Sequence, residues 1–182
     1  MAKRAVIAID IQNDYFPGGK WPLVGADAAA DQAAKLLAGA RKAGDLVVHV
    51  RHEFPTTEAP FFVPGTEGVE THAKVKPLAG EPVVVKSEVN SFLKTNLKQV
   101  LDDNGIEELV ICGSMSHMCV DAATRAALDF GYPVTVIHDA CATHDQEFNG
   151  ATVPAAQTHT AFMAALGFAG AAMKATDEHL AG

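Results

Sequence analysis

The sequence predicts an α/β fold, a single-domain three-layer αβα sandwich built on a six-stranded parallel sheet. Short continuous apolar runs recur along the chain, which is typical of strands buried on both faces. Helical patterns separate these runs, as expected when a parallel sheet is covered on both sides. The length of 182 residues allows one domain with a substantial core and is short for two, so we expect one domain over 1–182.

The elements follow one another in a regular order. The predicted strands lie at 5–9, 46–50, 82–85, 107–112, 133–137 and about 171–174. The predicted helices lie at 27–43, 91–104, 119–130 and about 154–166. Gly44, Gly105 and Gly131 follow the first three helices, which is where helix C-termini favour glycine.

Residues 51–81 form the one long stretch in which no periodicity holds and proline and glycine recur. A stretch this long without regular structure is often a lid or a binding loop. Its aromatic residues Phe54, Phe61 and Phe62 either close over a ligand or form a hydrophobic cluster that pins the loop down.

Composition excludes several classes of partner. The net charge of −8 argues against nucleic acid and anionic membranes as partners. Three cysteines without a C-x-x-C spacing fit neither a disulfide scaffold nor a zinc ribbon. The N-terminal apolar run is too short for the core of a signal peptide, and no window approaches a membrane span. We therefore expect a cytoplasmic protein.

The most informative stretch is 109–121, where an apolar run stops at Gly113, a polar turn follows and Cys119 opens the predicted helix. A thiol at a helix N-terminus suits a nucleophile, because the dipole and the free N–H groups favour thiolate and can later hold an oxyanion. The alternative is that Cys119 is a small buried hydrophobic residue, the usual fate of a free cysteine.

Two charged residues are expected beside this cysteine. Asp10 ends the first strand and Lys86 ends the third, so both lie with Cys119 at the carboxyl edge of a parallel sheet, where sites form. A carboxylate can take the thiol proton and deliver it to a leaving amine, and an ammonium makes the two negative charges tolerable together. His117 is expected to contact substrate rather than to act as the base.

Several segments together resemble the isochorismatase-like cysteine hydrolase superfamily, which includes nicotinamidases, N-carbamoylsarcosine amidases and ureidoacrylate amidohydrolases. The matching segments are 8–16 (AIDIQNDYF), 85–86 (VK) with 90–92 (NSF), 113–120 (GSMSHMCV), 124–127 (TRAA) and 139–143 (DACAT). They cover nearly the whole chain in the right order.

The resemblance implies a sheet of Rossmann-like strand order and a catalytic triad. Asp10 would be the general base and acid, Lys86 the electrostatic partner and Cys119 the nucleophile. It also implies a cis peptide bond between Ser114 and Met115, with the N–H groups of Met115 and Cys119 forming the oxyanion hole. Dimers and tetramers are common in the superfamily, so a homodimer or homotetramer is expected.

Two departures limit what the resemblance implies. Nicotinamidases carry an Asp-x-His motif after the second strand that helps to bind a metal, whereas here that place reads Arg51-His52-Glu53-Phe54. We therefore expect no metal and no cofactor, and a nicotinamidase with a degenerate metal site remains an alternative. Isochorismatase itself does not use a cysteine nucleophile, so its activity is not implied for a chain that has Cys119.

The leading hypothesis is hydrolysis of a small amide, carbamoyl or related C–N bond through a thioester with Cys119. The residues expected around the small-molecule substrate are Gln12, Phe16, Trp21, Phe61, Phe62, Asn90, Met115, His117 and Met118. Trp21, the sole tryptophan, is either a core anchor or a pocket wall. The competing hypotheses are a silent binding or scaffold protein of the same fold and a thiol redox role for Cys119.

Overall fold

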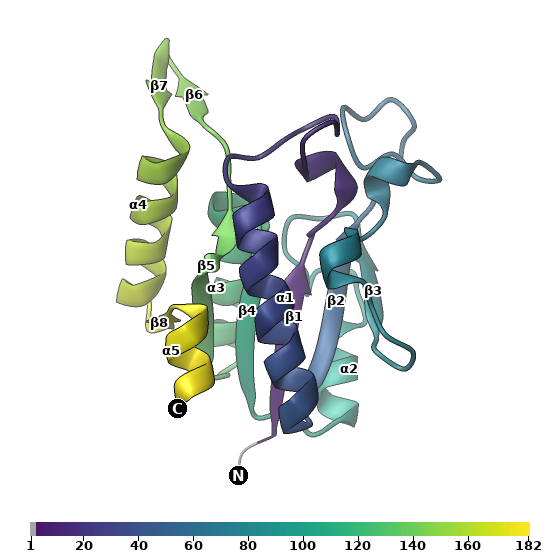
Figure 1. The fold of residues 1–182 in the computed structure, drawn as a ribbon, viewed down its shortest axis with the longest axis vertical. Coiled ribbons are helices and arrows are strands. Elements are labelled where there is room, and N and C mark those ends of the chain that lie inside the picture. Colours follow the sequence, from purple (N-terminus) through teal and green to yellow (C-terminus); the bar gives the residue numbers. More distant parts are fainter. Residues whose placement is uncertain (1–2) are drawn as a thin grey trace.

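A six-stranded parallel sheet forms the middle layer of the structure, a computed structural model that describes residues 3–182 (Figure 1). Its strands are β1 (Arg4–Ile9), β2 (Leu46–His52), β3 (Val83–Lys86), β4 (Glu108–Ser114), β5 (Val134–Ala142) and β8 (Ala172–Lys174). Their order is β3-β2-β1-β4-β5-β8, and every neighbouring pair is parallel. The predicted parallel sheet and its Rossmann-like order are confirmed.

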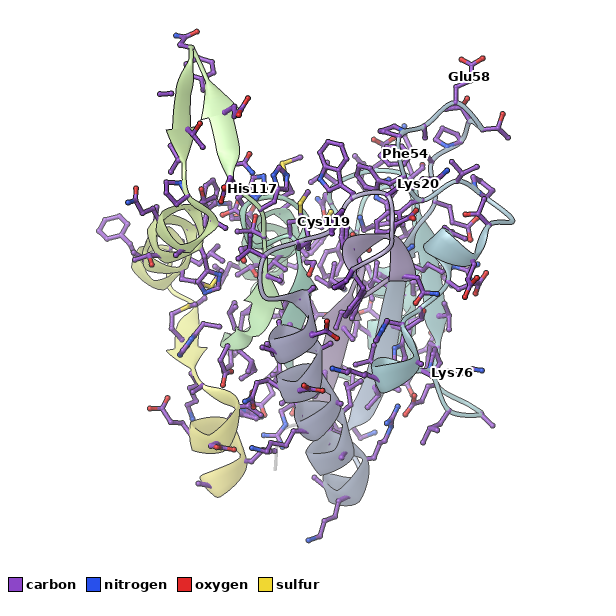
Figure 2. All side chains as sticks on the ribbon, turned by 45° about the horizontal axis from the view of Figure 1, so that its top comes forward. Lys20, Phe54, Glu58, Lys76, His117 and Cys119 are labelled. Atoms are coloured by element: carbon purple, nitrogen blue, oxygen red, sulfur yellow. The ribbon has the colours of Figure 1, made fainter. Side chains whose placement is uncertain are left out.

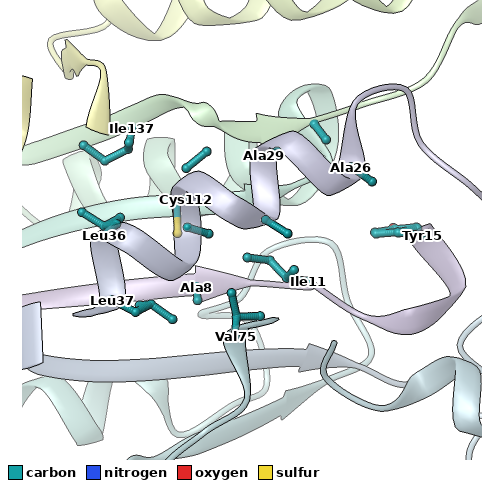
Figure 3. Packing of buried hydrophobic residues seen from close by; sticks show 14 of the residues in the cluster. Ala8, Ile11, Tyr15, Ala26, Ala29, Leu36, Leu37, Val75, Cys112 and Ile137 are labelled. Atoms are coloured by element: carbon teal, nitrogen blue, oxygen red, sulfur yellow. The ribbon is translucent and has the colours of Figure 1, made fainter. Parts of the chain in front are cut away.

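Helices cover both faces of this sheet (Figure 1). The helices α1 (Ala26–Ala43) and α5 (Thr176–Ala181) lie on one face, and α2 (Leu97–Asp103), α3 (Asp121–Asp129) and α4 (Ala155–Phe168) lie on the other. Figure 3 shows the alanines and leucines of α1 packed on the strands, and the residues labelled there include Ala26, Ala29, Leu36, Leu37, Ala8, Cys112 and Ile137. The predicted three-layer arrangement is confirmed.

Strand β1 shows why the central strands read as continuous apolar runs. Val6 and Ala8 belong to the core cluster under α1, whereas Ala5, Ile7 and Ile9 belong to the cluster on the opposite face. Because successive side chains of a strand point to opposite faces, a strand covered on both sides needs an apolar residue at every position.

None of the helices within 3–182 combines the length and the apolar character that a membrane span needs.

The carboxyl ends of the strands meet at the edge opposite the two chain termini (Figure 1). The long loop between β2 and β3 begins at this edge and then runs back along α1 to the start of β3. It contains two short 3-10 turns, Glu67–Val69 and Ala73–Val75. A hairpin of β6 (Gln146–Phe148) and β7 (Ala151–Val153) extends beyond the sheet at the same end. The first part of the long loop and the hairpin therefore lie at the edge where the strands end.

The predicted helix over 91–104 is too long, because α2 begins only at Leu97. The segment before it forms turns instead: Asn90 O accepts the N–H of Leu93, and the Thr95 hydroxyl donates to Ser91 O. Lys94 has a left-handed φ of 57°, which an α-helix does not allow. Side-chain hydrogen bonds of serine, threonine and asparagine to nearby backbone favour turns over helix.

The predicted start of the next helix at Cys119 is also displaced. A π-helical turn, Ser116–Val120, comes first, and regular α-helix begins at Asp121. Cys119 therefore lies inside the first turn and not at its opening residue.

The hairpin and α5 were not predicted, although the Asn149-Gly150 pair, with φ of 51° and 76°, is a strong hairpin signal.

Gly113 brings β4 and β1 close together just before the carboxyl edge. Its φ is 124°, and a Cβ there would lie 2.0 Å from the Ile9 carbonyl oxygen. Gly113→Ala is expected to lower the free energy of unfolding by at least about 2 kcal/mol, measured by urea denaturation.

Gly167→Ala is the matched control, because Gly167 lies inside α4 and a Cβ there meets only Met173 at 3.4 Å. This control is expected to be neutral or stabilising, since alanine favours helix over glycine. A Gly113→Ala protein as stable as the wild type would show that the strands do not need this close approach.

Candidate active site

A buried lysine ammonium lies at the centre of the site. Lys86 Nζ lies 2.8 Å from Asp10 Oδ2 and 3.2 Å from Cys119 Sγ, so the three predicted residues come together. It also lies 2.8 Å from His52 Nδ1 and 3.1 Å from the Glu88 carbonyl oxygen. The side chains of Lys86 and Asp10 are 0% exposed, and Cys119 is 5% exposed. This group is shielded from water on nearly every side.

Three neighbouring strands deliver these side chains. Asp10 follows β1 in a left-handed conformation (φ 50°), and its N–H donates to Val50 O of β2. Lys86 and His52 end β3 and β2 as partners in the parallel register. Paired residues of adjacent strands project from the same face of a sheet, so the lysine and histidine side chains meet.

Cys119 comes from the turn that follows β4. The peptide bond between Ser114 and Met115 is cis, and Met115 O accepts the N–H groups of Met118 and Val120. Ser116 Oγ donates to Ala142 O at 3.3 Å and lies 2.8 Å from His159 Nδ1, which ties the turn to β5 and α4. Figure 2, turned so that this edge comes forward, shows Cys119 between the labelled His117 and Phe54.

Burial and charge decide the resting protonation of the site. Burial raises the pKa of the Cys119 thiol well above its usual range, and the Asp10 carboxylate raises it further, while Lys86 opposes both. Burial disfavours the charge of Lys86, but Asp10 and Cys119 outweigh it and raise the pKa of the ammonium. The site therefore holds a thiol and an ammonium beside the Asp10 carboxylate. A proton can leave sulfur for the carboxylate without creating an unpaired charge.

His52 is the residue that the sequence analysis missed as a partner of the triad. Burial, and then the charge of Lys86, lower its pKa to about 4, so the ring is neutral near pH 7. Since a lysine ammonium has only hydrogens to donate, Nδ1 is the acceptor and Nε2 carries the ring hydrogen. The predicted strand ended at 50, two residues short of His52, so its pairing with Lys86 was not visible.

Three buried side chains could together offer ligand atoms to a metal ion. Within 3–182, Asp10, His52 and Cys119 place their ligand atoms within 4.8 Å of one another. The Lys86 ammonium lies within 3.2 Å of all three, so these donors already surround a positive charge. Glu53, the displaced carboxylate, is paired with Arg51. In this arrangement, neither His52 nor Glu53, which stand where the Asp-x-His motif would lie, is available to bind a metal.

Four of the predicted substrate residues support loops. Gln12 is fully buried and bonds only backbone: Nε2 donates to His52 O and Val69 O, and Oε1 accepts the His52 N–H. Phe62 is fully buried in the core cluster, and Phe16 is buried and stacks on His72. Asn90 Oδ1 accepts the N–H of Phe92 and fixes the turn after β3.

Of the other predicted residues, Met115 is 8% exposed and belongs to the core cluster under α1. The remaining ones lie nearer the surface: Phe61, Trp21, His117 and Met118. Ring contacts link five side chains, which we call the aromatic rim: Phe54, Phe61, Trp21, His144 and His117. Trp21 is 37% exposed, which excludes the first of its two predicted roles, that of a core anchor. Its ring lies against Phe61 and His144 of loops, where nothing encloses it completely. Met118, 38% exposed, is the neighbour of Cys119 in the chain.

Comparison with known proteins connects this geometry to a family. Residues 4–166 match the model of the Isochorismatase domain. The uncharacterized isochorismatase family protein YddQ of Bacillus subtilis is 49% identical over 97% of this chain and 98% of that protein. Streptothricin hydrolase of Streptomyces noursei is 40% identical over 90% of this chain and 59% of its own length. Maleamate amidohydrolase of Pseudomonas putida is 32% identical over 75% of this chain and 71% of its own length.

A solved structure shows the same fold over almost the whole chain. This crystal structure, described as that of an isochorismatase hydrolase from Oleispira antarctica, has a TM-score of 0.96 and 59% sequence identity to this chain. The alignment covers 99% of this chain and 97% of that one.

The depressed pKa of His52 predicts a pH dependence of stability. Between pH 6.5 and about 4 the unfolded chain binds a proton at this ring that the folded chain does not, so stability falls as pH falls through this window. The groups that face the ring are Lys86, Asp10, Cys119 and Glu88. Between pH 7 and 4.5, His52 should account for a loss of roughly 2 to 3 kcal/mol.

Urea denaturation of the wild type and His52→Asn at both pH values isolates this contribution, because all other titrations are common to the two proteins. The loss of stability should be smaller in His52→Asn by that amount. Equal losses in the two proteins would mean that the ring is not held neutral by its surroundings.

Proposed function

The chain belongs to the isochorismatase family of hydrolases, and from this we propose that it hydrolyses a small amide, carbamoyl or related C–N bond with Cys119 as the nucleophile. The observation that carries the proposal is the position of the Lys86 ammonium, in contact with both a buried carboxylate and a buried thiol. Such a trio supplies a nucleophile, a proton carrier and a fixed positive charge in one water-poor place.

In the proposed first half-reaction, Cys119 sulfur attacks the carbonyl carbon of the substrate while its proton passes to the Asp10 carboxylate. The carbonyl oxygen becomes an oxyanion held by the N–H groups of Met115 and Cys119. The C–N bond then breaks, and protonated Asp10 gives its proton to the departing nitrogen. The products of this half are a free amine or ammonia and a thioester on Cys119.

In the proposed second half-reaction, water attacks the thioester and gives a proton to Asp10. The C–S bond breaks, the carboxylic or carbamic acid leaves, and the proton returns to sulfur. Lys86 stays protonated throughout, so its positive charge stabilises the negative charge on Asp10 or on the Cys119 sulfur at each step. Because the residues around it are buried, this charge is screened little by water.

The relatives support a C–N bond as the target. Maleamate amidohydrolase, by its name, acts on an amide, and streptothricin hydrolase is named as a hydrolase of a different compound. These names favour the reaction class and leave the substrate open. We propose that the aromatic rim and Met118 contact the substrate, while Gln12, Phe16, Phe62 and Asn90 act by holding the loops around it.

A thiol redox role finds less support in the arrangement of the cysteines. Cys112 and Cys141 are 0% and 8% exposed, and Cys112 faces the core cluster on the α1 side of the sheet. Cys119 belongs to the cluster on the other face, and all three thiols are free. Neither Cys112 nor Cys141 is thus exposed in the way that a resolving thiol for Cys119 would need to be.

The test is turnover of a panel of small amides and carbamoyl compounds, with hydroxylamine added to trap acyl groups and intact-protein mass spectrometry to detect the thioester. Cys119→Ala should lower kcat/KM by at least about 1,000-fold and abolish the adduct. The matched control is Cys112→Ala, which also removes a buried thiol from the sheet region but lies on the opposite face. It should keep the adduct.

Turnover by Cys119→Ala at the wild-type rate would overturn the proposed mechanism. No adduct and no turnover across the panel would favour the alternative of a binding protein that has the fold without the reaction.

A further inference from the structure

Lys86 Nζ has one more close partner than it has hydrogens: it forms three hydrogen bonds, to His52, Glu88 and Cys119, and an ion pair with Asp10. An ammonium has three N–H groups, yet four acceptors lie within 3.2 Å of Nζ. Two of them, Asp10 and Cys119, belong to the proposed reaction. The other two, His52 Nδ1 and the Glu88 carbonyl, are neutral, and His52 is the closer at 2.8 Å.

We propose that His52 is a positioning residue for Lys86: its neutral Nδ1 accepts one ammonium hydrogen and thereby holds Nζ in contact with both Asp10 and Cys119. The proposal rests on the proposed function and adds a residue to it. Without this acceptor the flexible lysine side chain shifts toward the Asp10 carboxylate, its strongest partner, and the Glu88 carbonyl, and the thiol loses part of its support.

The surroundings of His52 hold both its backbone and its ring, while Nε2 has no hydrogen-bond partner among the described residues. The fully buried Gln12 bonds both the N–H and the C=O of His52, which clamps the end of β2. The ring lies 4.5 Å from the ring of Phe54 and 6.1 Å from that of Phe62. An apolar side chain would satisfy such packing as well as imidazole does, so packing alone does not explain a nitrogen placed 2.8 Å from an ammonium.

Neutrality is the property that suits histidine to this position. A carboxylate at the same place would be a second negative partner beside Asp10 and would draw the ammonium away from the thiol. A protonated ring would place two cations in contact. Burial and the charge of Lys86 prevent that protonation above a pKa of about 4, against the opposing effects of Asp10 and Glu88.

His52→Asn and His52→Leu form a matched pair for the test, because the two side chains have nearly the same shape. The amide oxygen of asparagine can replace Nδ1 as a neutral acceptor, whereas leucine offers none. The readouts are the rate of Cys119 alkylation by iodoacetamide in the free protein and kcat/KM, with Lys86→Ala as the reference. Alkylation is expected to be about tenfold slower in His52→Leu than in the wild type, and in His52→Asn within about threefold of it.

A packing role predicts the opposite ranking, because leucine fills a buried apolar site better than asparagine. Leucine equal to or faster than asparagine would therefore overturn the proposal, provided that Lys86→Ala slows alkylation. If Lys86→Ala leaves alkylation unchanged, the proposed function fails first, because Lys86 then does not support the thiol. Should His52→Leu not fold, as judged by circular dichroism, His52→Met takes its place with the same expected and contrary results, because methionine also fills the site and its sulfur is only a weak acceptor.

Discussion

The ion pair between Asp10 and Lys86 is the interaction on which the rest of the site depends. Both side chains are completely buried, and removing two charges from water costs several kcal/mol for each unless they are well paired. The pair can form only if β1 and β3, which are separated by β2, keep their register at the carboxyl edge. The close approach at Gly113 and the clamp by Gln12 serve the same end.

Most of the sheet could be predicted because its strands are buried on both faces. In β1, for example, alternate residues enter two different core clusters, which leaves an uninterrupted apolar run in the sequence. The start of α2 could not be predicted in the same way, since the turn before it depends on hydrogen bonds of Asn90, Ser91 and Thr95. The apolar pattern does not report such local competition.

The same contrast holds within the site. Asp10, Lys86 and Cys119 were predicted because each follows an apolar run that ends at one edge of a parallel sheet. His52 was missed because β2 continues through polar residues that the apolar run does not include. Gln12 and Phe62 were placed among the substrate residues. The Gln12 side chain, however, forms hydrogen bonds with backbone groups of His52, and Phe62 is completely buried, so we assign both residues to holding the loops.

The most direct test of this account is a double-mutant cycle of Asp10→Asn and Lys86→Met, with the free energy of unfolding measured by urea denaturation at pH 7. Each single change leaves one buried charge without its partner and should cost about 3–5 kcal/mol. The double change removes both charges, so it should cost clearly less than the sum of the two. Additive losses would contradict the account, because they would mean that Asp10 and Lys86 do not stabilise each other in the folded protein.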